Sequence, residues 1–157
     1  QLDTEYLLFL DADIVLGKAD TLEKVYREVT RRKLDLAVTD IRCENAGAFD
    51  RFFWGGFGFM ARAKVLGPVV TGMFVFIRRE AFWQAGGFRE DMLLGDDVEL
   101  GRQIRSPKFT LVPTWIYTSN RRFVKDGYLK TVLSYIQVFF SRQQRMKRRT
   151  EYFGMGY

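Results

Sequence analysis

Histidine is absent from the sequence, and Cys43 is the single cysteine. Without histidine the chain cannot form a Ser-His-Asp triad, a histidine metal site or a histidine general base. A lone cysteine excludes an intrachain disulfide and a cysteine-based zinc site. Acid–base chemistry must therefore use Asp, Glu, Lys, Tyr or the Cys43 thiol, and carboxylates become the main candidates.

The sequence also shows no signal-peptide pattern and no membrane-spanning run. It opens with QLDTEY, without a basic and then apolar leader region. No stretch reaches the roughly 18 uninterrupted apolar residues of a membrane span. We therefore expect a cytoplasmic location, with peripheral attachment to the cytoplasmic face of a membrane left open. The 157 residues, of which 47% are apolar and 16% aromatic, suffice for the core of one domain.

The segment Tyr6 to Leu16, YLLFLDADIVL, combines an apolar run with two aspartates. Its first part, Tyr6 to Leu10, predicts a strand buried on both faces and central in its sheet, because it lacks polar alternation. Asp11 and Asp13 follow, and in extended backbone their side chains would point the same way. Two adjacent carboxylates attract a hard cation such as Mg²⁺ or Mn²⁺. The alternative is that these aspartates only end the strand or cap a helix.

Apolar spacing and turn residues predict further strands and helices in alternation, which is typical of an α/β fold with a sheet flanked by helices. Because a fully apolar strand so close to Gln1 needs neighbours on both sides, we expect the fold to be incomplete at the N-terminus. The expected elements are a helix from Asp20 or Thr21 to Val29, a strand at Leu34–Thr39 ended by Asp40, a helix or broken helix at Ala48–Lys64, a strand at Thr71–Ile77, a short helix at Arg78–Ala85, a helix capped by Asp96 or Asp97 and stopped by Pro107, and a strand at Phe109–Tyr117 with Pro113 at an edge or bulge.

The C-terminal part carries most of the net charge of +6. Residues Asp126 to Phe140 have apolar side chains at steps of three and four, which predicts an amphipathic helix, and the Arg and Lys residues of 142–149 follow it. Such a segment suits an anionic membrane surface. A helix docked on the domain, with a solvated basic end, explains the pattern equally well. The pattern disfavours nucleic acid as a partner, because the surplus of basic over acidic residues is confined to this C-terminal part.

Four sequence segments follow one another along the chain: FLDADIVL, GPVVTGMFVFIRREAFWQAGGF, LLGDDVELGRQIR and TSNRRF. In this order and spacing, the chain resembles the C-terminal, acceptor-side portion of a family 2 glycosyltransferase with the GT-A fold. The resemblance implies a partial GT-A catalytic domain over residues 1–125, with a mixed sheet flanked by helices, followed by the amphipathic helix and basic tail of 126–157. It also implies inverting transfer of a sugar from a nucleotide-diphosphate sugar donor to an acceptor hydroxyl or phosphate on a glycan or lipid-linked molecule.

The resemblance assigns roles to the two acidic pairs. Asp11 and Asp13 match the D-x-D motif, with Asp13 as the direct metal ligand and Asp11 toward the donor ribose or a metal-bound water. Asp97 matches the catalytic base, and Asp96 stands where the family usually has Glu. The alternative for Asp96 and Asp97 is a helix cap with a favourable dipole contact.

Four further residues have expected roles near the donor. Thr71 and Gly72 would lie under the acceptor or donor sugar, where glycine permits close backbone approach. Arg121 and Arg122 would bind diphosphate oxygens, or else form a solvated basic turn.

Three family features are missing from the chain. It lacks the nucleotide-binding half, the histidine that some members use as a third metal ligand, and the Q-x-x-R-W motif of processive members. Single-sugar transfer is therefore favoured over polymer synthesis. The competing interpretations are a catalytically silent fragment that binds metal or acceptor, and a peripheral membrane-interaction module.

Overall fold

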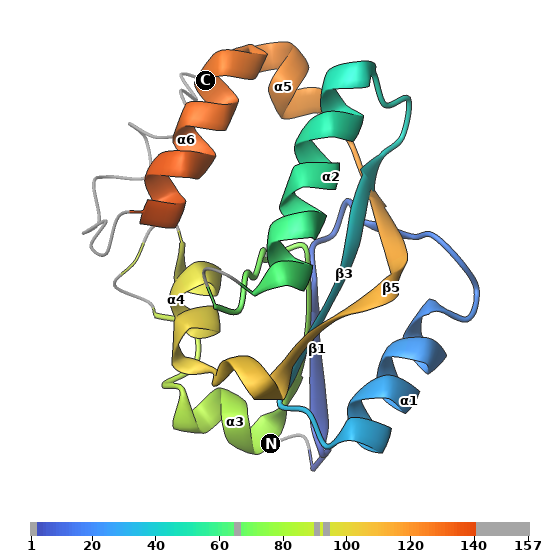
Figure 1. Ribbon diagram of the computed structural model, residues 1–157, viewed down its shortest axis with the longest axis vertical. Coiled ribbons are helices and arrows are strands. Elements are labelled where there is room, and N and C mark those ends of the chain that lie inside the picture. Colours follow the sequence, from blue (N-terminus) through green and yellow to red (C-terminus); the bar gives the residue numbers. More distant parts are fainter. Residues whose placement is uncertain (1–2, 65–66, 90–91, 93–94, 141–157) are drawn as a thin grey trace.

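The computed structural model describes residues 3–64, 67–89, 92 and 95–140, and it forms a mixed sheet with helices packed around it (Figure 1). The strands are β1 (Tyr6–Leu10), β2 (Val15–Leu16), β3 (Leu36–Cys43), β4 (Phe74–Arg78) and β5 (Phe109–Thr118). The helices are α1 (Thr21–Arg32), α2 (Ala48–Ala63), α3 (Arg79–Gln84), α4 (Asp96–Gln103), α5 (Arg121–Asp126) and α6 (Tyr128–Phe140), with a 3₁₀ turn at Ser106–Lys108. The predicted alternation of strands and helices is confirmed, and the chain is an α/β protein.

The five strands lie in the order β1-β4-β3-β5-β2. The β3–β5 pair is parallel and the other pairs are antiparallel. In the described part of the chain, β1 pairs only with β4 and is an edge strand. Leu8 and Leu10 are 36% and 40% exposed. The prediction that this strand is buried on both faces is therefore wrong for this sheet, because an apolar run does not reveal whether its neighbours are present.

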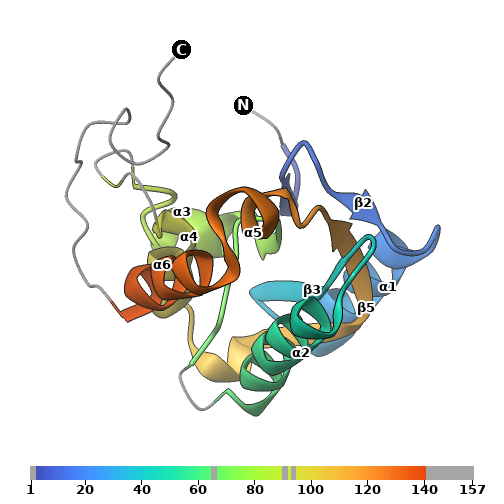
Figure 2. The same cartoon turned by 90° about the horizontal axis from the view of Figure 1, so that it is seen from above.

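Apolar side chains cover both faces of the central strand β3. Leu36 and Val38 join a core with Ala61 of α2, whereas Ala37, one residue away, joins a second core with Val25 of α1. Alternate residues of a strand point to opposite faces, so α1 and α2 cover opposite sides of the sheet, as the two views show (Figures 1 and 2). This double burial is why the first part of β3, residues 36–38, is apolar without alternation.

The short connection between β1 and β2 forces the sheet to curl. These strands lie at opposite edges, but only residues 11–14 join them. Five chain steps span at most about 18 Å, whereas the outer strands of a flat five-stranded sheet are about 19 Å apart. A turn, in which Ile14 N–H donates to the Asp11 carbonyl at 3.2 Å, shortens this connection further. The curl therefore brings the two edges together and carries Asp11 and Asp13 across the end of the sheet.

The predicted end of one strand needs correction, and of the two alternatives for Pro113 the bulge is confirmed. β3 continues past Asp40 to Cys43, because the Asp40 carboxylate is neutralised by Arg62 of α2 and the backbone stays paired with β5. Pro113 marks a bulge, since the β3–β5 register shifts between Thr39 and Asp40 opposite it. It does not mark an edge, because β5 lies between β3 and β2.

The predicted helices at 20–29 and 48–64 are confirmed as α1 and α2, with differences in which side chains they bury. On α1, Val25 and Val29 are buried but Leu22 and Tyr26 are exposed. On α2, Trp54 is buried, whereas Phe52 and Phe59 are 80% and 71% exposed. The aromatic side chains of α2 therefore belong only in part to the hydrophobic core.

The predicted helix from Asp126 to Phe140 is confirmed as α6, and the short helix α5 precedes it. Gly127, with φ of 84°, separates α5 from α6. The buried face of α6 includes Thr131, while Leu129 and Leu133 are exposed. Residues 142–149 lie outside the described part of the chain, and the division at residue 125 stays a prediction. None of the described helices has the length and apolar character required to cross a membrane.

Candidate active site

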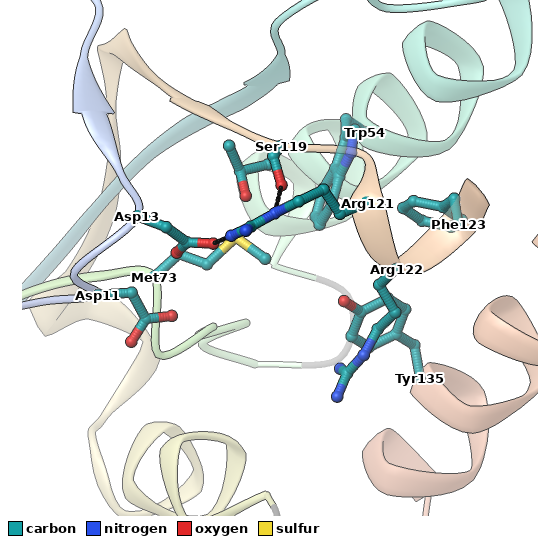
Figure 3. Close-up of a pocket in the computed structure, with 10 residues that line it drawn as sticks. Asp11, Asp13, Trp54, Met73, Ser119, Arg121, Arg122, Phe123 and Tyr135 are labelled. Atoms are coloured by element: carbon teal, nitrogen blue, oxygen red, sulfur yellow. Dashed lines mark hydrogen bonds and ion pairs between the residues drawn. The ribbon is translucent and has the colours of Figure 1, made fainter. Parts of the chain in front are cut away.

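A hollow of about 250 Å³ opens where β1 and β5 end (Figure 3). β1, β3 and β5 run in the same direction, so their carboxyl ends lie at one edge of the sheet. That edge is where ligands bind in open α/β sheets. The hollow is lined by Asp11, Asp13, Trp54, Met73, Thr118, Ser119, Arg121, Arg122, Phe123 and Tyr135. Four of the predicted site residues, Asp11, Asp13, Arg121 and Arg122, are therefore brought together.

Asp11 and Asp13 reach the hollow from a turn, not from an extended strand. Asp11 N–H donates to the Met73 carbonyl at 3.4 Å, and the chain then turns at Ala12 and Asp13. The expectation of extended backbone is wrong, but both carboxylates still face the same space (Figure 3). Burial raises the pKa of Asp11, and the negative charges of Asp13 and Asp96 raise it further. The site therefore concentrates negative charge that a cation would relieve.

Two arginines follow β5 at the start of α5. The Arg121 guanidinium donates from Nη2 to Asp13 Oδ2 at 3.1 Å and from Nε to Ser119 Oγ at 3.0 Å. Arg122 lies over the Tyr135 ring of α6, 6.0 Å from its centroid, and points away from the two aspartates (Figure 3). The two neighbouring cations therefore have different partners, and Arg121 alone pairs with the acidic turn.

The second acidic pair opens α4. The N-cap is Gly95, with φ of 80°, and no side chain caps the helix, so Asp96 and Asp97 occupy its first turn instead of capping it. Asp97 accepts hydrogen bonds from Gly72 N–H at Oδ2, 2.5 Å, and from Val98 N–H at Oδ1, 2.7 Å. Burial raises the pKa of Asp97 to about 6, with a further contribution from Asp96, while these hydrogen bonds oppose the shift.

Gly72 lies beside Asp97, outside the lining of the hollow. A Cβ built on Gly72 would meet Asp97 Oδ2 at 3.5 Å, which is ordinary contact, so this pairing does not itself require glycine. Thr71 is half-buried, and neither it nor Asp96 lines the hollow. The two acidic pairs are linked through neighbouring backbone groups, since Asp97 accepts from Gly72 N–H and Asp11 N–H donates to the Met73 carbonyl. The charge of Asp96 also raises the pKa of Asp11.

The carboxylates fit a hydrated divalent cation better than a closed protein cage. Among residues 3–64, 67–89, 92 and 95–140, no group of three or more His, Cys, Asp or Glu side chains is close enough to hold a metal ion. Mg²⁺ typically takes one or two carboxylates, keeps several waters and completes its shell with substrate phosphates. Asp11 and Asp13 supply that minimal oxygen set, with Asp13 half exposed.

No family model matches the chain, and a search of curated proteins finds no match.

Several residues of the hollow are not apparent from the sequence. Trp54 comes from α2, where its indole N–H donates to Cys43 Sγ at 3.2 Å. Tyr135 comes from α6, where it packs against Trp54 with ring centroids 6.3 Å apart. The sequence around Trp54 and Tyr135 does not indicate a functional site, because each side chain reaches the hollow through the packing of helices that are far apart in the sequence. Ser119 lies within the TSNRRF segment, so its position next to Arg121 could have been suspected.

Proposed function

We propose that the chain is a glycosyltransferase domain of the GT-A type, which transfers a sugar with inversion from a nucleotide-diphosphate sugar to an acceptor hydroxyl or phosphate. The proposal rests on the four ordered motifs and on one structural observation. Asp97 and the turn of Asp11 and Asp13 are distant in sequence, but they bond to neighbouring backbone groups: Asp97 Oδ2 accepts from Gly72 N–H at 2.5 Å, and Asp11 N–H donates to the Met73 carbonyl at 3.4 Å. Two acidic groups gathered at the carboxyl edge of a sheet suit a donor site beside an acceptor base.

Each group has a role in the proposed transfer. Asp11 and Asp13 would hold Mg²⁺ or Mn²⁺, which would supply positive charge to neutralise the departing diphosphate. Asp97 accepts the acceptor proton, and its pKa of about 6 suits a general base near neutral pH. The hollow of about 250 Å³ is smaller than the roughly 300–1,000 Å³ of pockets that bury drug-sized ligands. It therefore suits the diphosphate portion of a donor.

Metal-dependent nucleotide binding and the Asp97 variant test the proposal. We expect calorimetry to detect uridine or guanosine diphosphate binding that requires Mn²⁺. Asp97→Asn should abolish transfer and retain this binding, while Asp126→Asn, a carboxylate change on α5 outside the hollow, should leave both unchanged. Unaltered turnover in Asp97→Asn would refute the assignment. Metal-dependent binding without transfer by the parent protein would instead favour a catalytically silent binding module.

A peripheral membrane role is a second candidate, favoured by the exposed apolar surface of two neighbouring helices. α6 exposes Leu129, Leu133 and Ile136 on the side away from its buried Thr131. α2 packs against it through Phe49 and Tyr128, with ring centroids 4.6 Å apart. The exposed cations of α5 and the start of α6 include Arg121, Arg122, Lys125 and Lys130, and the exposed aromatic side chains of α2 are Phe49, Phe52 and Phe59.

Apolar side chains beside cations suit an anionic leaflet, such as the cytoplasmic face of a membrane. Because Tyr135 of the same helix lines the hollow, membrane contact through α6 would hold the hollow close to a lipid-linked acceptor. We therefore favour a lipid-linked acceptor over a soluble glycan.

Vesicle sedimentation separates these possibilities. The protein should sediment with vesicles that contain phosphatidylserine and less with pure phosphatidylcholine. Leu129→Ser combined with Leu133→Ser should abolish sedimentation, whereas Leu22→Ser, which alters an exposed leucine of α1, should not. Equal sedimentation of all variants would refute a membrane role for α6, and loss of binding with retained transfer would assign α6 to localisation.

A further inference from the structure

The guanidinium of Arg121 pairs with the Asp13 carboxylate, which a metal ion would use as a ligand. Arg121 begins α5, and Asp13 lies in the turn after β1, 108 residues earlier. Arg121 Nη2 lies 3.1 Å from Asp13 Oδ2, and Ser119 Oγ accepts from Arg121 Nε at 3.0 Å, so the guanidinium bridges the two sides of the hollow (Figure 3). A cation of the chain itself therefore neutralises the acidic turn in this state.

This ion pair is easily displaced. The side chains of Arg121 and Asp13 are 77% and 51% exposed, and exposed pairs alter an equilibrium by only about two- to fivefold. One guanidinium also does not balance the negative charge of the acidic residues at this site. Among the described residues no ion pair reaches Asp11, which is partly buried and repelled by both Asp13 and Asp96. A dication would relieve this repulsion more completely than Arg121 does.

We propose that Arg121 is an exchangeable counter-ion, which pairs with Asp13 before the metal binds and transfers to the diphosphate when the metal takes Asp13. The proposal rests on the proposed function, since metal and diphosphate are the ligands of that site. A guanidinium and a dication cannot share one carboxylate oxygen without repulsion, so metal binding releases Arg121. Its fork of N–H donors then matches phosphate oxygens in the same hollow.

The exchange makes Arg121 act in opposite directions on the two ligands. It competes with the free metal ion for Asp13, so it weakens metal binding in the absence of diphosphate. It contacts the diphosphate once the metal is bound, so it strengthens binding of the metal–diphosphate complex. Diphosphate and metal therefore bind with positive coupling, and the coupling is reciprocal. A purely structural ion pair would also compete with the metal ion for Asp13, but it would not strengthen binding of the metal–diphosphate complex.

Binding of Mn²⁺ alone and of preformed manganese pyrophosphate provides the test, because neither measurement requires turnover. Arg121→Gln should bind Mn²⁺ about two- to fivefold more tightly than the parent protein. It should bind manganese pyrophosphate about tenfold more weakly, as expected for loss of a charged hydrogen bond. The matched control is Arg122→Gln, which removes the same charge from the same hollow but leaves the Asp13 pair intact. Mn²⁺ affinity is read by electron paramagnetic resonance, and urea midpoints verify folding.

Each outcome decides between the alternatives. Tighter Mn²⁺ binding and weaker pyrophosphate binding in Arg121→Gln, with Mn²⁺ binding unchanged in Arg122→Gln, supports the exchange. If both variants bind Mn²⁺ more tightly to the same extent, the effect comes only from the loss of one positive charge, and the proposal is overturned. Manganese-dependent pyrophosphate binding that Arg121→Gln leaves unaltered would overturn the exchange alone and leave the proposed function standing. A parent protein that binds neither Mn²⁺ nor manganese pyrophosphate would overturn both.

Discussion

The carboxyl group of Asp97 should make the stability of this protein depend on pH. Its pKa is about 6 in the folded protein, against 3.8 without the fold, chiefly because of burial. A raised carboxyl pKa means that the folded state binds the proton more tightly. Its favourable contribution is thus complete below pH 3.8 and is lost as the pH rises through about 6. At 1.36 kcal/mol per pKa unit, the loss is about 3 kcal/mol.

The variant Asp97→Asn isolates this contribution. Asparagine has one acceptor oxygen, so it cannot accept from both Gly72 N–H and Val98 N–H as the carboxylate does. One buried N–H then loses its partner, at a cost of about 1–3 kcal/mol that does not vary with pH. The absolute stability of the variant at one pH is therefore uninformative. The informative quantity is how the stability difference between the two proteins changes with pH.

Urea unfolding of both proteins between pH 3 and pH 7 measures that difference. We expect the free energy of unfolding of the parent protein to fall by about 3 kcal/mol relative to Asp97→Asn as the pH rises across this range. Asp126→Asn, on α5, should give a flat difference. A flat difference for Asp97→Asn as well would refute the assignment of a raised pKa to Asp97 and remove the electrostatic support for its role as a base. If Asp97 is the base, kcat/KM should rise through the same pH of about 6.

Two other features give stability and labelling predictions. Gly101→Ala should destabilise the protein by about 1–3 kcal/mol in urea unfolding, because its Cβ would lie 2.7 Å from Val70 Cγ2 and 3.0 Å from the Pro68 carbonyl. Gly55→Ala on α2, where a Cβ meets nothing within 4 Å, should stabilise by about 0.5–1 kcal/mol, and the opposite order would contradict this account. Cys43 is buried with a raised pKa, so its thiol should react with a disulfide reagent only on unfolding, and rapid labelling of the native protein would show that it is accessible.

Local sequence signals were enough to predict α2, in spite of its glycines. Asp50 accepts from Gly47 N–H at 2.8 Å, which is the start signal of the helix, and Lys64 ends it in a left-handed conformation. Gly58 has a packing reason, since a Cβ there would lie 2.8 Å from Asp40 Oδ1. The spacing of aromatic residues could not predict which of them are buried, because the face of α2 that meets α6 depends on a helix far along the chain.

Burial of β1 and the extent of β3 were predicted less well, for a related reason. The run YLLFL has the same apolar pattern as a central strand, but its burial depends on which strands lie beside it. Asp40 would end a strand if its carboxylate had to reach water. Arg62 pairs with it from α2, so the strand continues past it. For β1 and β3 alike, the apolar pattern of the strand itself was predicted. The neighbouring strands that decide the burial of β1, and the arginine that lets β3 continue, were not.

The candidate site was partly predictable because strand direction determines which residues meet. Asp11 and Asp13 follow β1, and Arg121 follows the parallel β5, so these carboxyl ends meet at one edge of the sheet. β4 is antiparallel, so the segment before it, which includes Gly72, arrives at the same edge. These positions follow from the strand order once that order is known. The Arg121–Asp13 pair did not follow from the sequence, since it needs the curl of the sheet as well.

Asp97 reaches the site in a different way from the other acidic residues. It lies in the first turn of α4, not at a strand end, and its position depends on the hydrogen bond from Gly72 N–H. That bond joins α4 to the segment that leads into β4, so the sheet edge positions the carboxylate indirectly. Burial is the first cause of the raised pKa of Asp97, and the hydrogen bond from Gly72 N–H opposes it. The backbone of Gly72, rather than any side chain of the hollow, therefore connects the proposed base to the edge of the sheet that carries Asp11 and Asp13.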